Sequence, residues 1–240
     1  MKTDLGTALQ IIAHRGASGV APENTLAALR AAAAAGAHGA EVDVQSTSDG
    51  VLVLVHDDTW QRTAGFLGAV AATPWDVARR LDVGSWFATS FGGEGVPTLD
   101  EVLDCGGDGF RFNLEIKSPE NHRDLGPRIL TAVRRHDAFE RVVCTCFDPD
   151  VIEALAAAET RLQCGYLSAS TVVRRHPNIR TYAIRGTALR AAPEWIRGVR
   201  AEGGQVWAWT VDGLDEAQAL AREGVEAIIT NRPERFCMRQ

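Results

Sequence analysis

Short runs of β-branched and other apolar residues recur along the chain, and most are separated by helical patterns rich in alanine, leucine and arginine. These runs predict strands at residues 11–14, 40–45, 51–56, 112–117, 142–147, 162–167, 181–185, 206–211 and 227–230. The clearest helical patterns lie at residues 26–35, 125–136, 149–159, 193–202 and 214–222. Strands that alternate with helices indicate a parallel sheet, either closed into a barrel or open.

One pair of predicted strands breaks this alternation. Only residues 46–50 separate Gln45 from Val51, whereas a parallel crossover needs about a dozen residues or more. The pair therefore predicts an antiparallel hairpin, with Asp49 and Gly50 as its turn dipeptide. Eight strands remain without the return strand. Eight strands in 240 residues, each with a helix, predict an α/β fold of the TIM (β/α)8 barrel type.

The segment at residues 57–97 has no strong period and contains many glycines. A featureless loop of this length is uncommon in a compact domain unless it is functional. We therefore expect a single TIM-barrel domain over residues 1–240, with residues 57–97 as a small insertion after the second strand, on the catalytic face. The insertion carries aromatic residues that could form either a small core or an apolar entrance: Trp60, Phe66, Trp75, Trp86, Phe87 and Phe91.

Charge and composition exclude several classes of protein. Lysine plus arginine number 25 against 31 acidic residues, a net charge of −6 that argues against a duplex-DNA partner. No apolar run is long enough to span a bilayer, and the N-terminus lacks the apolar core of a signal peptide. The five cysteines include no CxxC pair and indicate a reducing compartment. We expect a cytoplasmic protein without stable membrane association; the sequence does not define its oligomeric state.

Ionisable residues gather where the predicted strands end, which is where a TIM barrel carries its chemistry. Period-two alternation places Glu41 and Asp43 on one face of their strand, and Glu115 and Lys117 on one face of theirs. A two-residue turn would set His56 opposite Asp43, and a turn two residues longer would set it opposite Glu41. Either register brings the histidine beside the carboxylates. Seven side chains should therefore converge: His14, Arg15, Glu41, Asp43, His56, Glu115 and Lys117.

Three buried carboxylates in one place need compensation. One hard divalent cation, Mg²⁺ or Ca²⁺, would supply it, and zinc is disfavoured by this ligand set. Arg15 and Lys117 suit an anionic substrate such as a phosphate, and two histidines suit general acid and base work. The combination predicts metal-assisted phosphoryl transfer. The alternative is an ordinary ion-pair network that involves no catalysis.

Two tryptophans lie near the end of the predicted strand at residues 206–211. We expect one of Trp207 and Trp209 to pack on the helix layer and the other to face the barrel. Trp209 could cover an apolar part of the substrate or could serve only as core packing.

An ordered set of motifs resembles the glycerophosphodiester phosphodiesterase family. The motifs are IAHRG at 12–16, PENT at 22–25, EVDV at 41–44, TSDG at 47–50, LVHD at 54–57, RT at 62–63, LEIK at 114–117, AWTVD at 208–212 and IITN at 228–231. The resemblance implies a TIM barrel that hydrolyses glycerophosphodiesters to sn-glycerol 3-phosphate and an alcohol. It also implies attack of the glycerol 2-hydroxyl on phosphorus through a cyclic phosphate, which water then opens.

The resemblance implies roles for individual residues as well. By position, Glu41, Asp43 and Glu115 match the metal ligands of the family. His14 and His56 match its acid and base, and Arg15 and Lys117 match its phosphate contacts. Many members have asparagine where this chain has Asp212, a departure that could affect the alcohol group of the substrate. Arg185 lies in a segment without a family motif and could contact substrate.

Two alternatives stay open at this point. A lysophospholipase D-like or phosphoinositide-type phosphodiesterase would use an apolar entrance, for which the aromatic residues of the insertion are suggestive. A phosphodiester-binding barrel without activity would be expected to lack acid, base or metal residues, yet the full set is present here.

Overall fold

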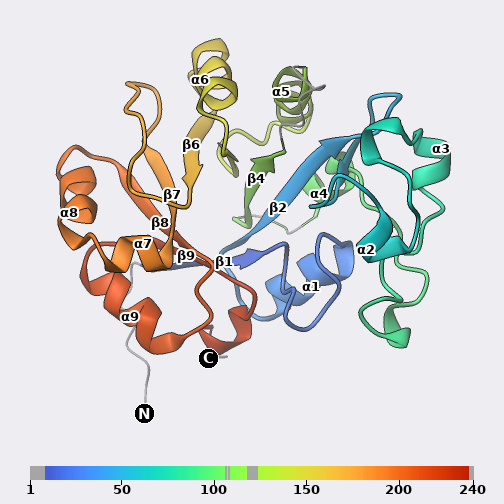
Figure 1. Cartoon of the computed structure of the whole chain (residues 1–240), viewed down its shortest axis with the longest axis horizontal. Coiled ribbons are helices and arrows are strands. Elements are labelled where there is room, and N and C mark those ends of the chain that lie inside the picture. The colour runs from blue at the N-terminus through green and yellow to red at the C-terminus, as the bar shows by residue number, and fades with distance from the viewer. Residues whose placement is uncertain (1–8, 106, 108, 118–123, 238–240) are drawn as a thin grey trace.

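A computed structural model describes residues 9–105, 107, 109–117 and 124–237 of the chain. Within these residues eight parallel strands close into a ring, in the order β1-β9-β8-β7-β6-β5-β4-β2, with β2 paired back to β1 (Figure 1). The predicted TIM barrel is therefore confirmed. The strands are β1 Gln10–His14, β2 Gly39–Ser46, β4 Arg111–Ile116, β5 Val142–Cys146, β6 Gln163–Ser168, β7 Thr181–Arg185, β8 Gln205–Trp209 and β9 Ala227–Thr230.

Helices surround this ring (Figure 1). They are α1 Leu26–Ala34, α4 Leu99–Leu103, α5 Leu125–Arg135, α6 Pro149–Ala158, α7 Gly186–Arg190, α8 Pro193–Ala201 and α9 Leu214–Arg222, followed by the short η3 Pro233–Arg235. The five predicted helices are confirmed to within one residue at their ends, whereas the sequence pattern missed α4 and α7. Side-chain caps stabilise the N-termini of two of these helices: Thr25 caps α1, and Thr98 with Glu101 forms a capping box on α4.

The connection from β6 to β7 departs from the prediction that each barrel strand has its helix. Residues 169–180 contain no helix, and Pro177 together with the β-branched residues 171–173 disfavours one. In place of a helix, the guanidinium of Arg175 lies over the ring of Tyr182, 4.9 Å from the ring centroid. That ring in turn meets Trp195 of α8 edge to face. These side chains, one cationic and two aromatic, therefore pack on this side of the barrel.

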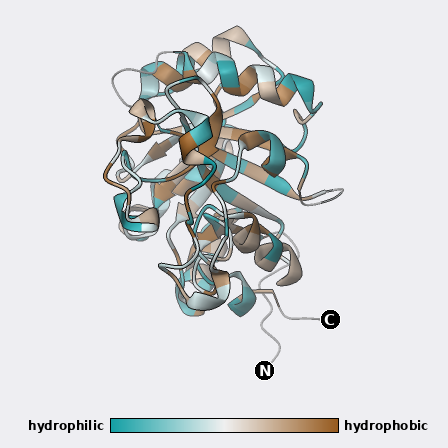
Figure 2. Cartoon of the chain, turned by 90° about the vertical axis from the view of Figure 1, so that its right-hand side faces the viewer, coloured by the Kyte–Doolittle hydropathy of each residue, from teal (hydrophilic) through white to brown (hydrophobic). Residues whose placement is uncertain are grey.

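Alternation along the strands produces two apolar layers. Outward residues such as Val42, Val44 and Leu114 pack against the helices, which carry apolar and polar residues on different faces (Figure 2). Inward residues fill the barrel as a smaller cluster: Ile12, Val143, Leu167, Ala183, Trp207, Ala227 and Ile229, with Trp209 packed against it. The expectation that one tryptophan of β8 would face the helices is wrong. Residues two apart share a face, so Trp207 and Trp209 both point inward.

The hairpin after β2 exists, but its register is neither of the two predicted. Strand β3 spans only Leu52–Leu54 and pairs antiparallel with β2, with Val44 opposite Leu54. The amide of Gly50 donates to the carbonyl of Thr47, and Gly50 has a φ of 90°. This is a three-residue connection with a left-handed glycine. The register therefore falls between the two expected ones, and His56 lies beyond the end of β3.

The segment at residues 57–97 lies beside β2 and β3 and contains short helices: α2 Gln61–Ala64, η1 Val70–Ala72, α3 Trp75–Ala78 and η2 Thr89–Phe91 (Figure 1). It shares a small core with β3, in which Trp60 is fully buried among Val53, Val70 and Val96. Phe66 and Trp86 are exposed. The aromatic residues of the segment thus divide between a small core and the surface.

Candidate active site

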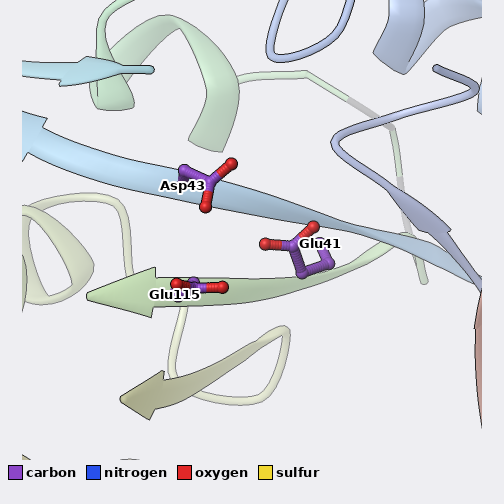
Figure 3. A group of neighbouring side chains, drawn as sticks. All are labelled: Glu41, Asp43 and Glu115. Carbon is purple, nitrogen blue, oxygen red and sulfur yellow. The ribbon is translucent and has the colours of Figure 1, made fainter. Parts of the chain in front are cut away.

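Three carboxylates meet at the carboxyl ends of two neighbouring strands. Glu41 and Asp43 project from β2 and Glu115 from β4, and in the register of these strands Asp43 lies beside Glu115 (Figure 3). One oxygen of each side chain lies within 4.8 Å of the others. All three side chains are buried, and Glu41 Oε1 and Asp43 Oδ1 have no hydrogen-bond partner among the described residues. Buried oxygens without donors are suited to ligate a cation, so this ligand set fits a hard divalent ion.

The electrostatics of the cluster also favour a cation. Burial raises the pKa of Glu41 well above its usual value, and the charges of Asp43 and Glu115 raise it further. Burial and Asp43 likewise raise the pKa of Glu115. Three anions are therefore costly to hold at this point by themselves, and a bound divalent cation would offset their repulsion.

Two basic side chains border the carboxylates, as the sequence predicted. Arg15 Nε lies 3.2 Å from Asp43 Oδ2, and Lys117 Nζ lies 2.8 Å from Glu115 Oε1 and 3.5 Å from Asp43 Oδ1. Burial alone would lower the pKa of Lys117, but Asp43 and Glu115 together raise it. Both cations therefore stay charged beside the site, where they can bind an anionic group.

The backbone around Arg15 is shaped to serve the cluster. Arg15 has a φ of 55°, in the left-handed region that few residues other than glycine adopt. Its amide donates to Glu41 Oε2 at 3.0 Å. Strain of this kind is retained where the surrounding structure enforces it, and functional sites are the usual place.

His14 is held through a chain of hydrogen bonds from the segments that follow β9 and β8, the next two strands of the barrel. Its Nδ1 lies 2.7 Å from Asn231 Oδ1, and the Asn231 amide donates through Nδ2 to Asp212 Oδ2 at 2.8 Å. The Asp212 carboxylate can only accept hydrogen bonds, so it contacts the amide nitrogen of Asn231 and leaves the Asn231 oxygen facing His14. His14 Nδ1 must then donate a hydrogen bond to that oxygen. Neutral His14 therefore carries its lone pair on Nε2, which lies 3.8 Å from Glu41 Oε2. Burial lowers the pKa of His14, which favours this neutral form.

His56 is oriented by a second chain of charges. Its Nδ1 lies 2.7 Å from Asp57 Oδ1, and Asp57 is held in turn by Arg62, which also binds Glu23. The hydrogen bond from Arg62, with a smaller contribution from His56, lowers the pKa of Asp57 to about 2. Asp57 therefore stays ionised and accepts a hydrogen bond from His56 Nδ1–H, which leaves Nε2 of the neutral ring as the base.

Several residues of the site were not assigned a role from the sequence. Asn24 donates to Asp43 Oδ2 at 2.8 Å and accepts from the Asp43 amide, so it fixes the position of that carboxylate. Glu23 binds both Arg15 and Arg62. Both residues belong to the PENT motif after the first strand, and polar residues at the carboxyl end of a barrel strand were the signal that could have identified them.

The predicted residues surround one cavity of about 270 Å³. His14, Arg15, Glu41, His56 and Glu115 line it together with Asn113. The far wall is formed by four apolar or aromatic side chains together with Arg185 and Thr210; the four are Phe147, Leu167, Trp209 and Ile229. Asp43 and Lys117 are adjacent to this lining, since Asp43 contacts Arg15 and Lys117 contacts Glu115. The structure therefore brings the seven predicted ionisable residues to one place.

Comparisons with known proteins identify the family of this chain. Residues 14–235 match the model of the glycerophosphoryl diester phosphodiesterase family. A glycerophosphodiester phosphodiesterase from Caldanaerobacter subterraneus is 34% identical over 93% of this chain and 94% of its own length. A phosphodiesterase from Oleispira antarctica, solved in complex with the product sn-glycerol-3-phosphate, has a TM-score of 0.88 and 28% identity and covers 95% of each chain. A glycerophosphodiester phosphodiesterase from Agrobacterium tumefaciens has a TM-score of 0.83 and 26% identity, over 95% of this chain and 99% of its own.

The fold and the site together define a TIM-barrel phosphodiesterase. The chain belongs to the glycerophosphoryl diester phosphodiesterase family, as the motifs of the sequence indicated. Across the described residues, the helices are all too short or too polar to cross a membrane.

Proposed function

We propose that this enzyme hydrolyses glycerophosphodiesters to sn-glycerol 3-phosphate and an alcohol, in a reaction that requires one divalent cation. The observation that carries the proposal is the approach of Glu41, Asp43 and Glu115 to within 4.8 Å of one another, beside two histidines. Family membership supports the substrate class, and so does the product bound by the Oleispira antarctica phosphodiesterase.

The three carboxylates would hold the cation, which we take to be Mg²⁺ or Ca²⁺ because all of the ligands are oxygens. When bound, such an ion supplies Lewis acidity, which stabilises negative charge on substrate oxygens. The remaining requirements of the reaction fall to residues of this chain.

The two histidines supply the proton transfers. One of His14 and His56 would take the proton of the glycerol 2-hydroxyl on Nε2 as that oxygen attacks phosphorus. The other would donate a proton from Nε2 to the departing alcohol oxygen, which leaves a cyclic phosphate. Water then opens the ring while the histidines exchange roles, so both return to their starting protonation states. The bonds from Nδ1 to Asn231 and Asp57 keep both Nε2 atoms available for this work.

Arg15 and Lys117 would bind the phosphoryl oxygens and offset the charge that grows on them in the transition state. Their ion pairs with Asp43 fix their positions before substrate arrives. The low exposure of both side chains, 18% each, strengthens their interaction with phosphate relative to that of a surface cation.

Removal of the cation should destabilise the protein increasingly as the pH rises. Glu41 and Glu115 have raised pKa values in the folded chain without metal. Their contribution to stability is therefore present below the ordinary glutamate pKa and is lost as the pH rises through the raised values. We expect the Tm of metal-loaded protein to exceed that of EDTA-treated protein by more at about pH 8 than at about pH 5. Thermal denaturation at both pH values checks this, and a gap that stays constant or narrows would contradict it.

A substrate without the glycerol 2-hydroxyl tests the attack by that group. The hydroxyl is attached to the same molecule as the phosphorus, so its attack gains the effective concentration of an intramolecular reaction. The 2-deoxy analogue should have a KM similar to that of the parent diester, yet its kcat should be lower by about 10³-fold or more. Steady-state kinetics of both diesters provide the comparison. Turnover of the 2-deoxy diester at nearly the parental rate would mean that water attacks directly.

We also propose that the enzyme works in a reducing compartment, the cytoplasm. All five cysteines have free thiols, and Cys144, Cys146 and Cys164 are buried in the barrel strands. Burial raises the pKa of Cys144 well above its ordinary value, and those of Cys146 to about 11 and Cys164 to about 12. These buried thiols pack in the core as small apolar groups, and the fold does not depend on a disulfide between them.

A further inference from the structure

One charged residue faces the active-site cavity from the side opposite the carboxylates. Arg185 ends β7, which lies across the barrel from β2 in the strand order. Its side chain is exposed and lines the cavity. The other residues of this far wall, among them Phe147, Leu167 and Trp209, carry no charge.

The guanidinium of Arg185 has a fixed platform but no counter-ion. It lies over the ring of Trp209, 5.2 Å from the centroid, and the register of the strands places Arg185 directly beside Trp209. Across the described part of the chain, no carboxylate pairs with it and no hydrogen bond engages it. This contrasts with Arg15 and Arg62, whose charges are met by Glu23. The five donors of Arg185 are therefore available to a ligand in the cavity.

The platform is itself held rigidly. Trp209 Nε1 donates to the carbonyl of Ala183 at 3.0 Å, and the ring meets Phe147 edge to face with centroids 5.7 Å apart. An aromatic ring of this kind could otherwise bind a quaternary ammonium group through its face. Here Arg185 already lies over that ring, and its positive charge opposes the approach of a second cation.

We propose that Arg185 is a specificity-determining residue, which selects diesters whose alcohol carries an anionic group and disfavours those with a cationic alcohol. This inference rests on the proposed function, because the glycerol 2-hydroxyl must stay near Glu41, Glu115 and the histidines. The alcohol on the other side of phosphorus then extends toward β7 and β8. There a carboxylate or a second phosphate meets the planar fork of Arg185, which matches the geometry of such oxyanions.

A series of three glycerophosphodiesters of similar size tests the proposal, with glycolate, ethylene glycol or ethanolamine as the alcohol. The measured quantity is the ratio of kcat/KM for the glycolate diester to that for the ethanolamine diester. It is compared between the wild-type enzyme and variants, so that the intrinsic reactivity of each leaving group cancels. Arg185→Gln should lower this ratio by about tenfold, and Arg185→Glu should lower it further.

Arg190→Gln is the matched control, since Arg190 is an exposed arginine on the neighbouring helix α7 that does not line the cavity. Its ratio should equal that of the wild type. An unchanged ratio in both Arg185 variants, with folding verified by their Tm, would overturn the proposal. Equal falls in the Arg185 and Arg190 variants would also overturn it, because the effect would then reflect general surface charge. If the wild type released glycerol 3-phosphate from none of the three diesters, the proposed function itself would be wrong, and this inference with it.

Discussion

Replacing His14 with alanine is expected to lower kcat by about 10²–10⁴-fold while the barrel stays folded. The partly buried ring holds its Nε2 toward the carboxylate cluster, and the hydrogen bonds through Asn231 and Asp212 keep it there. In the proposed mechanism, loss of the ring removes one of the two proton transfers from the transition state. His56→Ala should cost a similar factor for the other transfer. Steady-state kinetics and circular dichroism of each variant check the effect on rate and the state of the fold.

His176→Ala provides the control, because His176 lies in the β6–β7 connection and outside the active-site cavity. Its activity should equal that of the wild type. Full activity of either His14→Ala or His56→Ala would remove that histidine from the proposed mechanism.

Replacing Asp43 with asparagine is expected to lower kcat by about 10³-fold or more and to weaken metal binding. Asp43 is fully buried and touches Asn24, Arg15 and Lys117, so the change removes a proposed metal ligand together with the counter-ion of the two proposed phosphate-binding groups. The two side chains have nearly the same shape, so packing should be preserved. Kinetics over a range of Mg²⁺ and Ca²⁺ concentrations, with the metal content of dialysed protein, measure both effects.

Asp76→Asn is the matched control, since Asp76 is exposed on α3 and lies outside the cavity. It should leave kcat and metal content unchanged. If Asp43→Asn retained the metal content of the wild type, metal binding would not depend on this carboxylate.

The sequence predicted the barrel and the acidic cluster because both follow from short-range rules. Alternation along β2 places Glu41 and Asp43 on the inward face without any knowledge of neighbours. Parallel strands then bring Glu115 to the same rim, as the register confirms. The predicted register of the hairpin was wrong because Gly50 can serve either as the second residue of a two-residue turn or as the left-handed residue of a longer turn.

Other parts of the site depend on contacts between distant segments, which no local pattern encodes. Asn231 reaches His14 only because β9 closes the barrel beside β1. Asp212 was identified from the sequence as a departure from the family, yet its role in orienting Asn231 emerges only from the fold. Phe147 lies at the end of a predicted strand, and only the fold shows that its ring contacts Trp209 of β8 beside the cavity.

A metal-dependent mechanism is decided by the release of sn-glycerol 3-phosphate from a glycerophosphodiester, measured with metal-free enzyme before and after the addition of Mg²⁺ or Ca²⁺. The buried oxygens of Glu41 and Asp43 and the raised pKa values of Glu41 and Glu115 both favour a bound cation at this site. We predict no release after exhaustive chelation and full recovery on addition of one of the two ions. Undiminished release from the chelated enzyme would contradict the metal-dependent mechanism.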